Sequence, residues 1–328
     1  MSRAASLVKA PLQAICSDAG GAGPDCPPLC IVASIVNLRR IGLAYEPGLA
    51  STVRQVVLGR AREFCRAEGG FAAASGEHIV CVFEYGPNLE LDGGQRKPSE
   101  AELVDKIIEL LGVGVENGYG RLVYPAIHTT VVERADSSLD LLDVVARQDH
   151  DESLGWRSRY VADMERAEDL LTALSRGDLY LEYDAVQRSY DVDPISHYDV
   201  LWRRKGDCTL VRSTQQLAAL ERLGLVSRLD RWMVTSVIDM LREHAGPFRL
   251  RCSISAQSAR LDGWWHLVIE TLARQPRVAS RLVIQLTGVG SLREPPLLEF
   301  IKVLRMLGCS VAWPESAKSI KYSEVSFG

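Results

Sequence analysis

The residues that could carry chemistry are spread through the sequence rather than grouped in a known motif. Cys26 and Cys30 lack a matching cysteine or histidine pair, whereas a zinc site normally needs four ligands. No dinucleotide loop, Walker A motif or nucleophile elbow follows a strand-like run. We therefore expect no metal and no cofactor. Five of the six histidines lie at His78, His128, His197, His244 and His266, and they also lack metalloenzyme spacing.

Other candidate binding residues also have structural interpretations. The basic run 203–205 could contact a phosphate, although a charge run in a loop is usually solvated. Trp264 and Trp265 could anchor a protein partner, because tryptophan dominates interface hot spots, or they could cap a core. Glu221 and Asp230 are expected on a helix surface or at a helix cap.

The composition predicts a globular, cytoplasmic protein. The 328 residues are 47% hydrophobic and 24% charged, and this length implies roughly two domains. A net charge of −4 argues against a nucleic-acid partner. No apolar run approaches the roughly 20 residues that a membrane span needs, and the N-terminus is a poor secretory signal. The eight cysteines show no disulfide pattern.

The first half of the chain predicts an α/β sheet domain. Residues 1–29 are expected to form a flexible arm, since glycines and prolines punctuate them. Strand-like and helical runs then alternate over 30–146, followed by a polar linker at 147–160. Strands are expected at 29–36, 79–83 and 121–132, helices at 49–66, 99–111 and 139–146, and a turn at 69–74.

The second half, 161–328, continues the alternation and predicts parallel β-α-β units of a barrel-like wheel. A long helix is expected at 160–176, ended by Gly177. Further strands are expected at 179–183, 199–203, 248–255, 281–287 and 310–313, and helices at 213–223, 228–244, 264–274 and 296–307.

Several motifs of this second half resemble the EAL domain, a family of cyclic di-GMP phosphodiesterases. The runs 221–226 and 229–234 are similar to the family's successive helices "AE..GL" and "LD.WV". The segment from Asp199 to Arg203 stands where the naming motif E-A-L-x-R belongs. Partial matches lie in the expected order before and after this segment, at 178–183, 252–255, 284–288, 304–308 and 310–315.

The first half resembles a degenerate GGDEF domain, the diguanylate cyclase fold that often precedes an EAL domain. The segment 35–41 is similar to a "D-L-D-x-F-K" strand and turn, and 74–78 stands where G-G-D-E-F belongs. The expected fold class is therefore α/β: a degenerate GGDEF-like sheet domain followed by an incomplete EAL-like (β/α) barrel.

The resemblance implies that the phosphodiesterase metal ligands have been replaced. That reaction uses two divalent cations held by carboxylate and amide oxygens. Asp199 stands for the naming Glu, Ser253 for an Asn and Gln285 for a Glu. Gly288 stands for a further Glu, and Pro314 and Glu315 for paired aspartates. The resemblance thus implies no held pair of Mg²⁺ ions and no catalytic residue.

The resemblance implies equivalent losses in the cyclase half. Ala74 and Ser75 replace the two glycines that let GTP approach the backbone, and Gly76 replaces the aspartate. Asn37 lies near the first metal position without flanking acids. Glu77 alone cannot hold Mg·GTP, so no cyclase activity is expected.

The sequence ends at Gly328, shortly after the position of the paired aspartates, whereas the family continues with further barrel elements. A shortened barrel would leave strand edges unpaired. We therefore expect self-association or a protein partner, unless the first domain covers the edge.

These expectations favour a catalytically inactive regulatory protein that acts by protein–protein interaction in bacterial cyclic di-GMP-linked signalling, such as control of biofilm, exopolysaccharide, motility or transcription. The alternative is a non-hydrolysing cyclic di-GMP receptor, whose ligand residues would be Arg203, contacting a phosphate, and Asp199. The structural interpretation of Arg203 is an ion pair with Asp199 or with Glu182. An active phosphodiesterase or cyclase and an RNA-binding adaptor are the least favoured interpretations.

Overall fold

A computed structural model describes residues 29–75, 78–83, 98–132, 154–186, 197–206, 214–288 and 295–312. The chain divides into two compact units. Unit 1 comprises 1–168 with 262–264, and unit 2 comprises 169–261 with 265–328. Residues 1–28 of the expected arm, the helix at 139–146, Gly76, Glu77, Pro314 and Glu315 lie outside the described residues, whereas Leu29, the last residue of that arm, begins β1. None of the described helices is long and apolar enough to cross a membrane.

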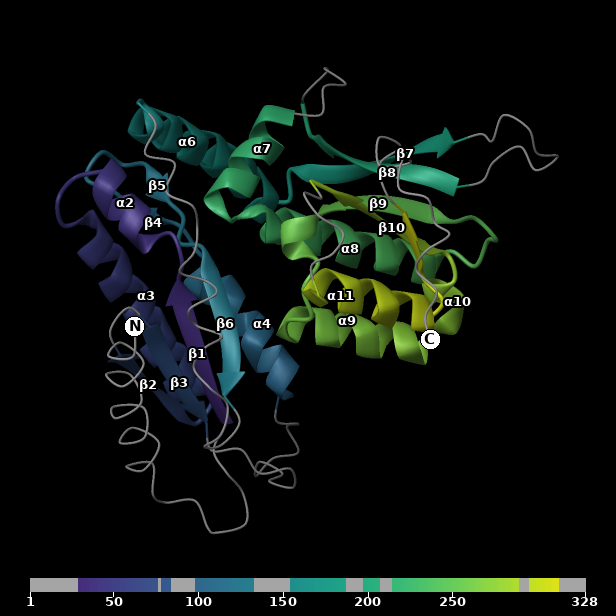
Figure 1. Cartoon of the computed structure of the whole chain (residues 1–328), viewed down its shortest axis with the longest axis horizontal. Helices are drawn as coiled ribbons and strands as arrows, with labels where there is room; N and C mark the ends of the chain where they lie inside the picture. The colour runs from purple at the N-terminus through teal and green to yellow at the C-terminus, as the bar shows by residue number, and fades with distance from the viewer. Residues whose placement is uncertain are drawn as a thin grey trace, which may run out of the picture. The chain divides into compact units, whose positions relative to one another are not determined.

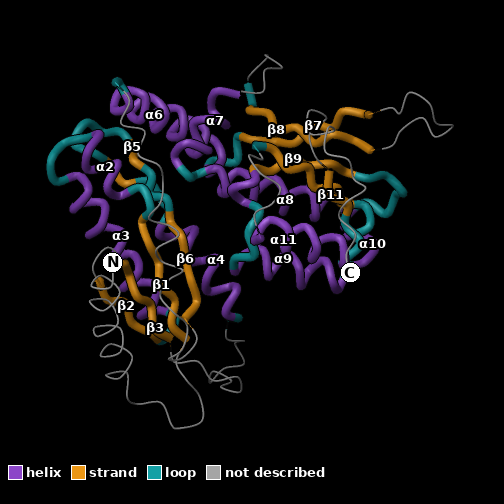
Figure 2. The backbone as a smooth tube through the Cα atoms, viewed as in Figure 1, coloured by secondary structure: helices purple, strands orange, loops and turns teal. Residues whose placement is uncertain are grey.

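Unit 1 is built on a four-stranded antiparallel sheet (Figures 1 and 2). Strand β1 is apolar along its whole length and all seven of its residues are buried, which explains its central position. The strand order is β2-β3-β1-β6, with every neighbouring pair antiparallel. The strands are β1 (Leu29–Ile35), β2 (Gly70–Ser75), β3 (His78–Phe83) and β6 (Ile127–Val132).

The helices of unit 1 bury regularly spaced apolar residues against this sheet. In α3 (Leu49–Ala67) every fourth residue from Leu49 to Cys65 is buried, which is the spacing of one helix face. Helix α3 packs on β2 and β3, α4 (Glu100–Leu111) packs on β6, and the two helices contact each other. The guanidinium of Arg60 joins them further by donating to the backbone oxygens of Val113 and Gly114, just after α4.

The start of α4 follows the sequence prediction. The Ser99 hydroxyl accepts the Glu102 backbone N–H at 3.2 Å, and the Glu102 carboxylate accepts the Ser99 N–H at 2.5 Å. Both bonds of a capping box are therefore present. They satisfy two backbone donors that the first turn of a helix leaves without intrahelical partners.

Two local predictions for unit 1 were wrong, and one helix was missed. The segment 69–74, expected as a turn, contains strand β2, because long-range pairing with β3 outweighs its weak strand propensity. The strand expected at 121–132 is divided at Pro125, which has no N–H for a ladder. Its first part, β5 (Leu122–Val123), pairs instead with β4 (Val115–Glu116). Helix α2 (Leu38–Ala44) was not expected.

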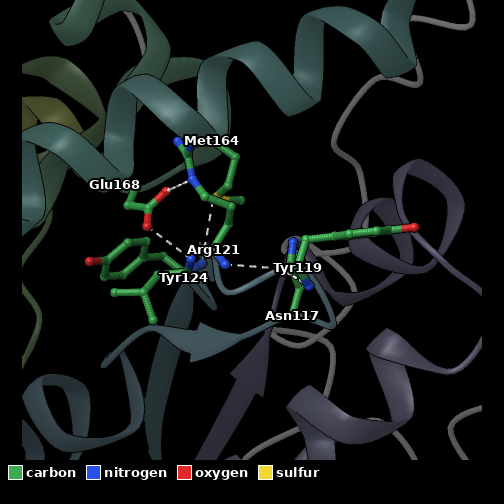
Figure 3. A network of polar contacts seen from close by, with 7 residues as sticks. Asn117, Tyr119, Arg121, Tyr124, Met164 and Glu168 are labelled. Carbon is green, nitrogen blue, oxygen red and sulfur yellow. Dashed lines mark hydrogen bonds and ion pairs between the residues drawn. The ribbon is translucent and has the colours of Figure 1, made fainter.

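Helix α6 (Trp156–Ser175) is attached to this β4–β5 hairpin by a polar network (Figure 3). The Glu168 carboxylate accepts the Leu122 backbone N–H at 3.0 Å and the Arg121 Nε–H at 2.6 Å. The Tyr124 N–H donates to the Met164 sulfur at 3.4 Å. Two backbone amides of β5 and its flank are therefore satisfied by side chains of α6.

Unit 2 contains a five-stranded sheet in the order β11-β10-β9-β8-β7. Strands β8 to β11 run parallel, which confirms the predicted β-α-β units, while β7 is antiparallel to β8. Among the described residues this sheet is open, with β7 and β11 at its edges. The strands are β7 (Leu179–Val186), β8 (His197–Arg204), β9 (Leu250–Ser255), β10 (Leu282–Thr287) and β11 (Ser310–Ala312).

Helices α8 to α11 lie along one side of this sheet (Figure 1). The strand residues on that side are apolar and nearly inaccessible: Val200, Cys252, Ile254, Ile284 and Leu286. Trp265 is also buried, which agrees with the core interpretation of this residue. Trp264 is buried as well and is assigned to unit 1. The helices are α7 (Thr214–Leu223), α8 (Val226–Glu243), α9 (Gly263–Arg274), α10 (Pro276–Ala279) and α11 (Pro295–Met306), with a 3₁₀ turn, η1, at Ala256–Ser258.

Replacing Gly59 by alanine is expected to stabilise unit 1. Gly59 is exposed in the middle of α3, and an added Cβ would meet no atom within 4 Å. Because alanine is the better helix former, Gly59→Ala should raise the free energy of unfolding by about 0.5–1 kcal/mol in a urea titration.

The matched control is Gly70→Ala in β2, where a Cβ would lie 2.3 Å from the Val82 carbonyl oxygen. This variant should be less stable than the parent. A destabilised Gly59→Ala would contradict the open environment of this position.

Candidate functional site

The candidate site residues lie on the sheet face of unit 2 opposite the helices. In the register of the sheet, Asp199 of β8 is aligned with Arg251 of β9, and Ser253 of β9 with Gln285 of β10. Aligned residues of neighbouring strands point to the same face. Asp199, Ser253 and Gln285, which were predicted from three separate segments, therefore share one polar face.

Asp199 forms an ion pair in which both carboxylate oxygens are engaged. The Arg251 Nε donates to Oδ1 at 2.5 Å, and the Arg251 Nη2 donates to Oδ2 at 2.6 Å. The His197 Nε2 lies 3.7 Å from Oδ1. The two side chains of the pair are 25% and 23% exposed. Such a two-point pair is the geometry in which arginine binds a carboxylate most strongly.

Arg203 pairs with Glu182 rather than with Asp199. Its Nε donates to the Glu182 carboxylate at 2.6 Å, from a side chain that is 11% exposed against 41% for Glu182. The remainder of the basic run is also held within unit 2. Arg204 donates to both Asp169 oxygens, and the Lys205 ammonium donates to the Gly177 carbonyl. The structure therefore contains one of the two ion pairs expected for Arg203. Arg203 and Arg204 lie in β8 and not in a solvated loop.

The other described positions that stand for metal ligands of the family carry no charge. The Ser253 hydroxyl donates to the Gln285 side-chain oxygen at 3.4 Å, a long bond between neutral groups. Gly288 adopts a left-handed conformation with φ 66°. Among the described residues, no three or more His, Cys, Asp or Glu side chains are grouped so that they could hold a metal ion.

In unit 1, Asn37 has a structural role at the position that the cyclase resemblance assigned to a metal. This residue is buried. Its amide donates to the Tyr124 carbonyl at 2.9 Å and accepts the Ala126 N–H at 2.9 Å. Asn37 thus joins the end of β1 to the segment around Pro125.

Two charged residues of unit 2 were not identified correctly from the sequence. Arg251 was missed, although polar residues alternate with apolar ones in Leu250-Arg-Cys-Ser-Ile-Ser255, which places Arg251 and Ser253 on one face. Asp230 was expected at a helix surface or cap, and this was wrong, because it is only 3% exposed. Two donors at the end of β9 offset the cost of burying it: the Ser255 backbone N–H and the Ser258 hydroxyl, which both hydrogen-bond to its carboxylate.

Comparison with known proteins gives a family match for one segment of the chain. Residues 167–313 match the EAL domain family. The match covers a little under half of the 328 residues and begins within α6. Within this EAL segment, β7 to β10 and the helices between them carry every described candidate residue of the polar face. No curated protein matches the sequence.

Similar solved structures include an S helix-GGDEF-EAL segment of LapD from Vibrio cholerae bound to c-di-GMP. It is 15% identical, with a TM-score of 0.43, and the alignment covers 96% of this chain and 75% of that chain. The EAL domain of FimX from Xanthomonas citri, in complex with c-diGMP, is 22% identical with a TM-score of 0.39. That alignment covers 47% of this chain and 62% of the FimX chain.

Removing Arg251 is expected to destabilise unit 2 more than removing an exposed arginine. Arg251→Met would leave a half-buried Asp199 carboxylate without its guanidinium, at a cost of about 1–3 kcal/mol. Asp199→Asn should destabilise the Arg251→Met variant less than it destabilises the parent protein. A double-mutant cycle in urea measures this coupling.

The control for this cycle is Arg242→Met, since Arg242 and Asp239 form a surface pair with side chains 38% and 52% exposed. Its cost should stay within about 1 kcal/mol. Equal losses of unfolding free energy for Arg251→Met and Arg242→Met would show that the Asp199–Arg251 pair contributes no more to stability than an exposed pair.

Proposed function

We propose that this protein is a catalytically inactive EAL-type regulator that acts through protein–protein interaction in cyclic di-GMP-linked signalling. The observation that carries the proposal is the two-point ion pair between Asp199 and Arg251. It occupies the position at which the EAL reaction would need a carboxylate free to bind a cation.

The charge balance of the polar face supports this proposal. A divalent cation would have to displace the Arg251 guanidinium from Asp199 and would then lie beside that positive charge. Ser253 and Gln285 offer neutral oxygens in place of negative ones. Metal-assisted water attack on a phosphodiester needs cations held by several anionic oxygens, so hydrolysis is not expected from this face.

The connection to cyclic di-GMP rests on the EAL match over residues 167–313. The LapD and FimX structures named above contain this ligand. For unit 1 we propose a degenerate GGDEF-like domain, an assignment that depends on the motifs in the sequence. A chain of this kind that does not turn over a substrate would act by self-association or by binding a partner protein.

One observation favours a second candidate function, a receptor that binds cyclic di-GMP without hydrolysis. Among the described residues, Arg203 makes its hydrogen bond through Nε alone, and its two terminal nitrogens donate to no side chain or carbonyl. Its partner Glu182 is half-exposed. A phosphate that replaced Glu182 at this guanidinium would therefore displace a half-exposed carboxylate rather than a buried one.

Incubation of the full chain with cyclic di-GMP and Mg²⁺ or Mn²⁺ should yield no hydrolysis product above a protein-free control, as followed by chromatography. Asp199→Asn is the matched control, because trace turnover by a contaminating enzyme would persist in this variant. Metal-dependent turnover that Asp199→Asn abolishes would refute the inactive assignment.

Calorimetric titration with cyclic di-GMP separates the two candidate functions. The interaction proposal predicts no binding heat at ligand concentrations of about 100 μM, with or without Mg²⁺ or Ca²⁺. Micromolar binding that is lost in Arg203→Ala and retained in Arg242→Ala, the exposed-arginine control, would replace the interaction proposal with the receptor.

A further inference from the structure

The carboxylate of Asp230 is buried in unit 2 at the carboxyl end of β9. Its Oδ2 accepts two hydrogen bonds, from the Ser255 backbone N–H at 3.0 Å and from the Ser258 hydroxyl at 2.6 Å. Ser255 ends β9, and Ser258 ends the η1 turn that follows it. A side chain of α8 therefore holds both ends of this turn.

The turn is connected in the same way to the next helix. The carbonyl oxygen of Ser258 accepts the indole N–H of Trp265 at 2.7 Å. Trp265 belongs to α9 and packs edge-on against Phe300 of α11, with ring centroids 4.6 Å apart. The hydrogen bonds thus run from Asp230 through Ser258 to Trp265, so a change at the carboxylate reaches the start of α9.

Within the part of the chain that the structure describes, no positively charged group acts on this carboxylate. Helix α8 packs against α7, β9, η1, α10 and β10, and the titratable groups that act on Asp230 from the described part of these elements are Glu221 of α7 and Cys252 of β9. Burial, and to a smaller extent the Glu221 charge, raise the pKa of Asp230 to about 7, against the opposing effect of the two hydrogen bonds.

We propose that Asp230 is a proton-operated switch that tightens and loosens the β9–η1 turn, through the two hydrogen bonds that its carboxylate accepts. As a carboxylate, Asp230 accepts two charge-assisted bonds and fixes the turn, at the cost of an unbalanced buried charge. As a neutral acid it removes that cost, but it is a weaker acceptor, so Ser255 and Ser258 are held less firmly. This inference does not depend on the proposed function.

The two forms should also affect global stability in opposite directions. The pKa of Asp230 is raised from 3.8 to about 7 in the folded chain, so the folded state binds this proton more tightly than the unfolded state. The contribution of this group to folding is fully present below about pH 4 and is lost as the pH rises to about 7. At acidic pH the turn is therefore looser, whereas the contribution of Asp230 to the stability of the whole fold is larger.

The direct test is an NMR titration of the labelled full chain between pH 5.5 and 8.5. The Ser255 amide and the Trp265 indole N–H should shift together with a midpoint near 7, with Trp265→Phe used to assign the indole signal. Asp230→Asn should abolish the shift. Asp239→Asn, on an exposed position of the same helix, should leave it unchanged.

A second variant keeps the proposal testable if Asp230→Asn does not fold. Glu221→Gln removes the neighbouring negative charge and should lower the midpoint of the titration. Signals of Ser255 and Trp265 that do not change with pH, a shift that persists in Asp230→Asn, or a midpoint that Glu221→Gln leaves unchanged would each overturn the proposal.

Discussion

The ion pair between Asp199 and Arg251 determines what the polar face of the unit 2 sheet can do. Half-buried charges need a partner because the protein cannot solvate them as water does. The parallel register aligns the two residues on neighbouring strands, so each becomes the partner of the other. Arg203 and Glu182 repeat this solution between β8 and β7. The charges within each of these two pairs are therefore matched, whereas a site that collects cations must keep an excess of negative charge.

Two aspartates of unit 2 show how the environment, rather than the residue type, sets chemical behaviour. Asp199 lies on the polar face and its charge is matched by a guanidinium. Asp230 lies on the helix side, where serine and backbone donors replace a cation. Hydrogen bonds alone offset only part of the cost of burying a charge. Burial without a cationic partner is the main reason that the pKa of Asp230 is raised.

Much of the fold could be predicted because it is encoded locally. Three elements are specified without reference to distant residues. They are β1 by its apolar run, α3 by an apolar residue at every fourth position, and α4 by its capping residues Ser99 and Glu102. Strand β2 could not be predicted in this way, because it depends on pairing with β3. The partner of Asp199 was also hidden, since Arg251 lies 52 residues away and only the register across a helical crossover aligns them.

The attachment of α6 to the β4–β5 hairpin has a consequence for solubility. A strand edge that presents free amides is a template onto which a strand from another chain can add. In unit 1 the amides of Leu122 and Tyr124 are already bonded by Glu168 and Met164 of α6. These two side chains occupy the places that the carbonyls of an incoming strand would take. The helix thereby protects this hairpin from edge-to-edge aggregation without adding another strand to it.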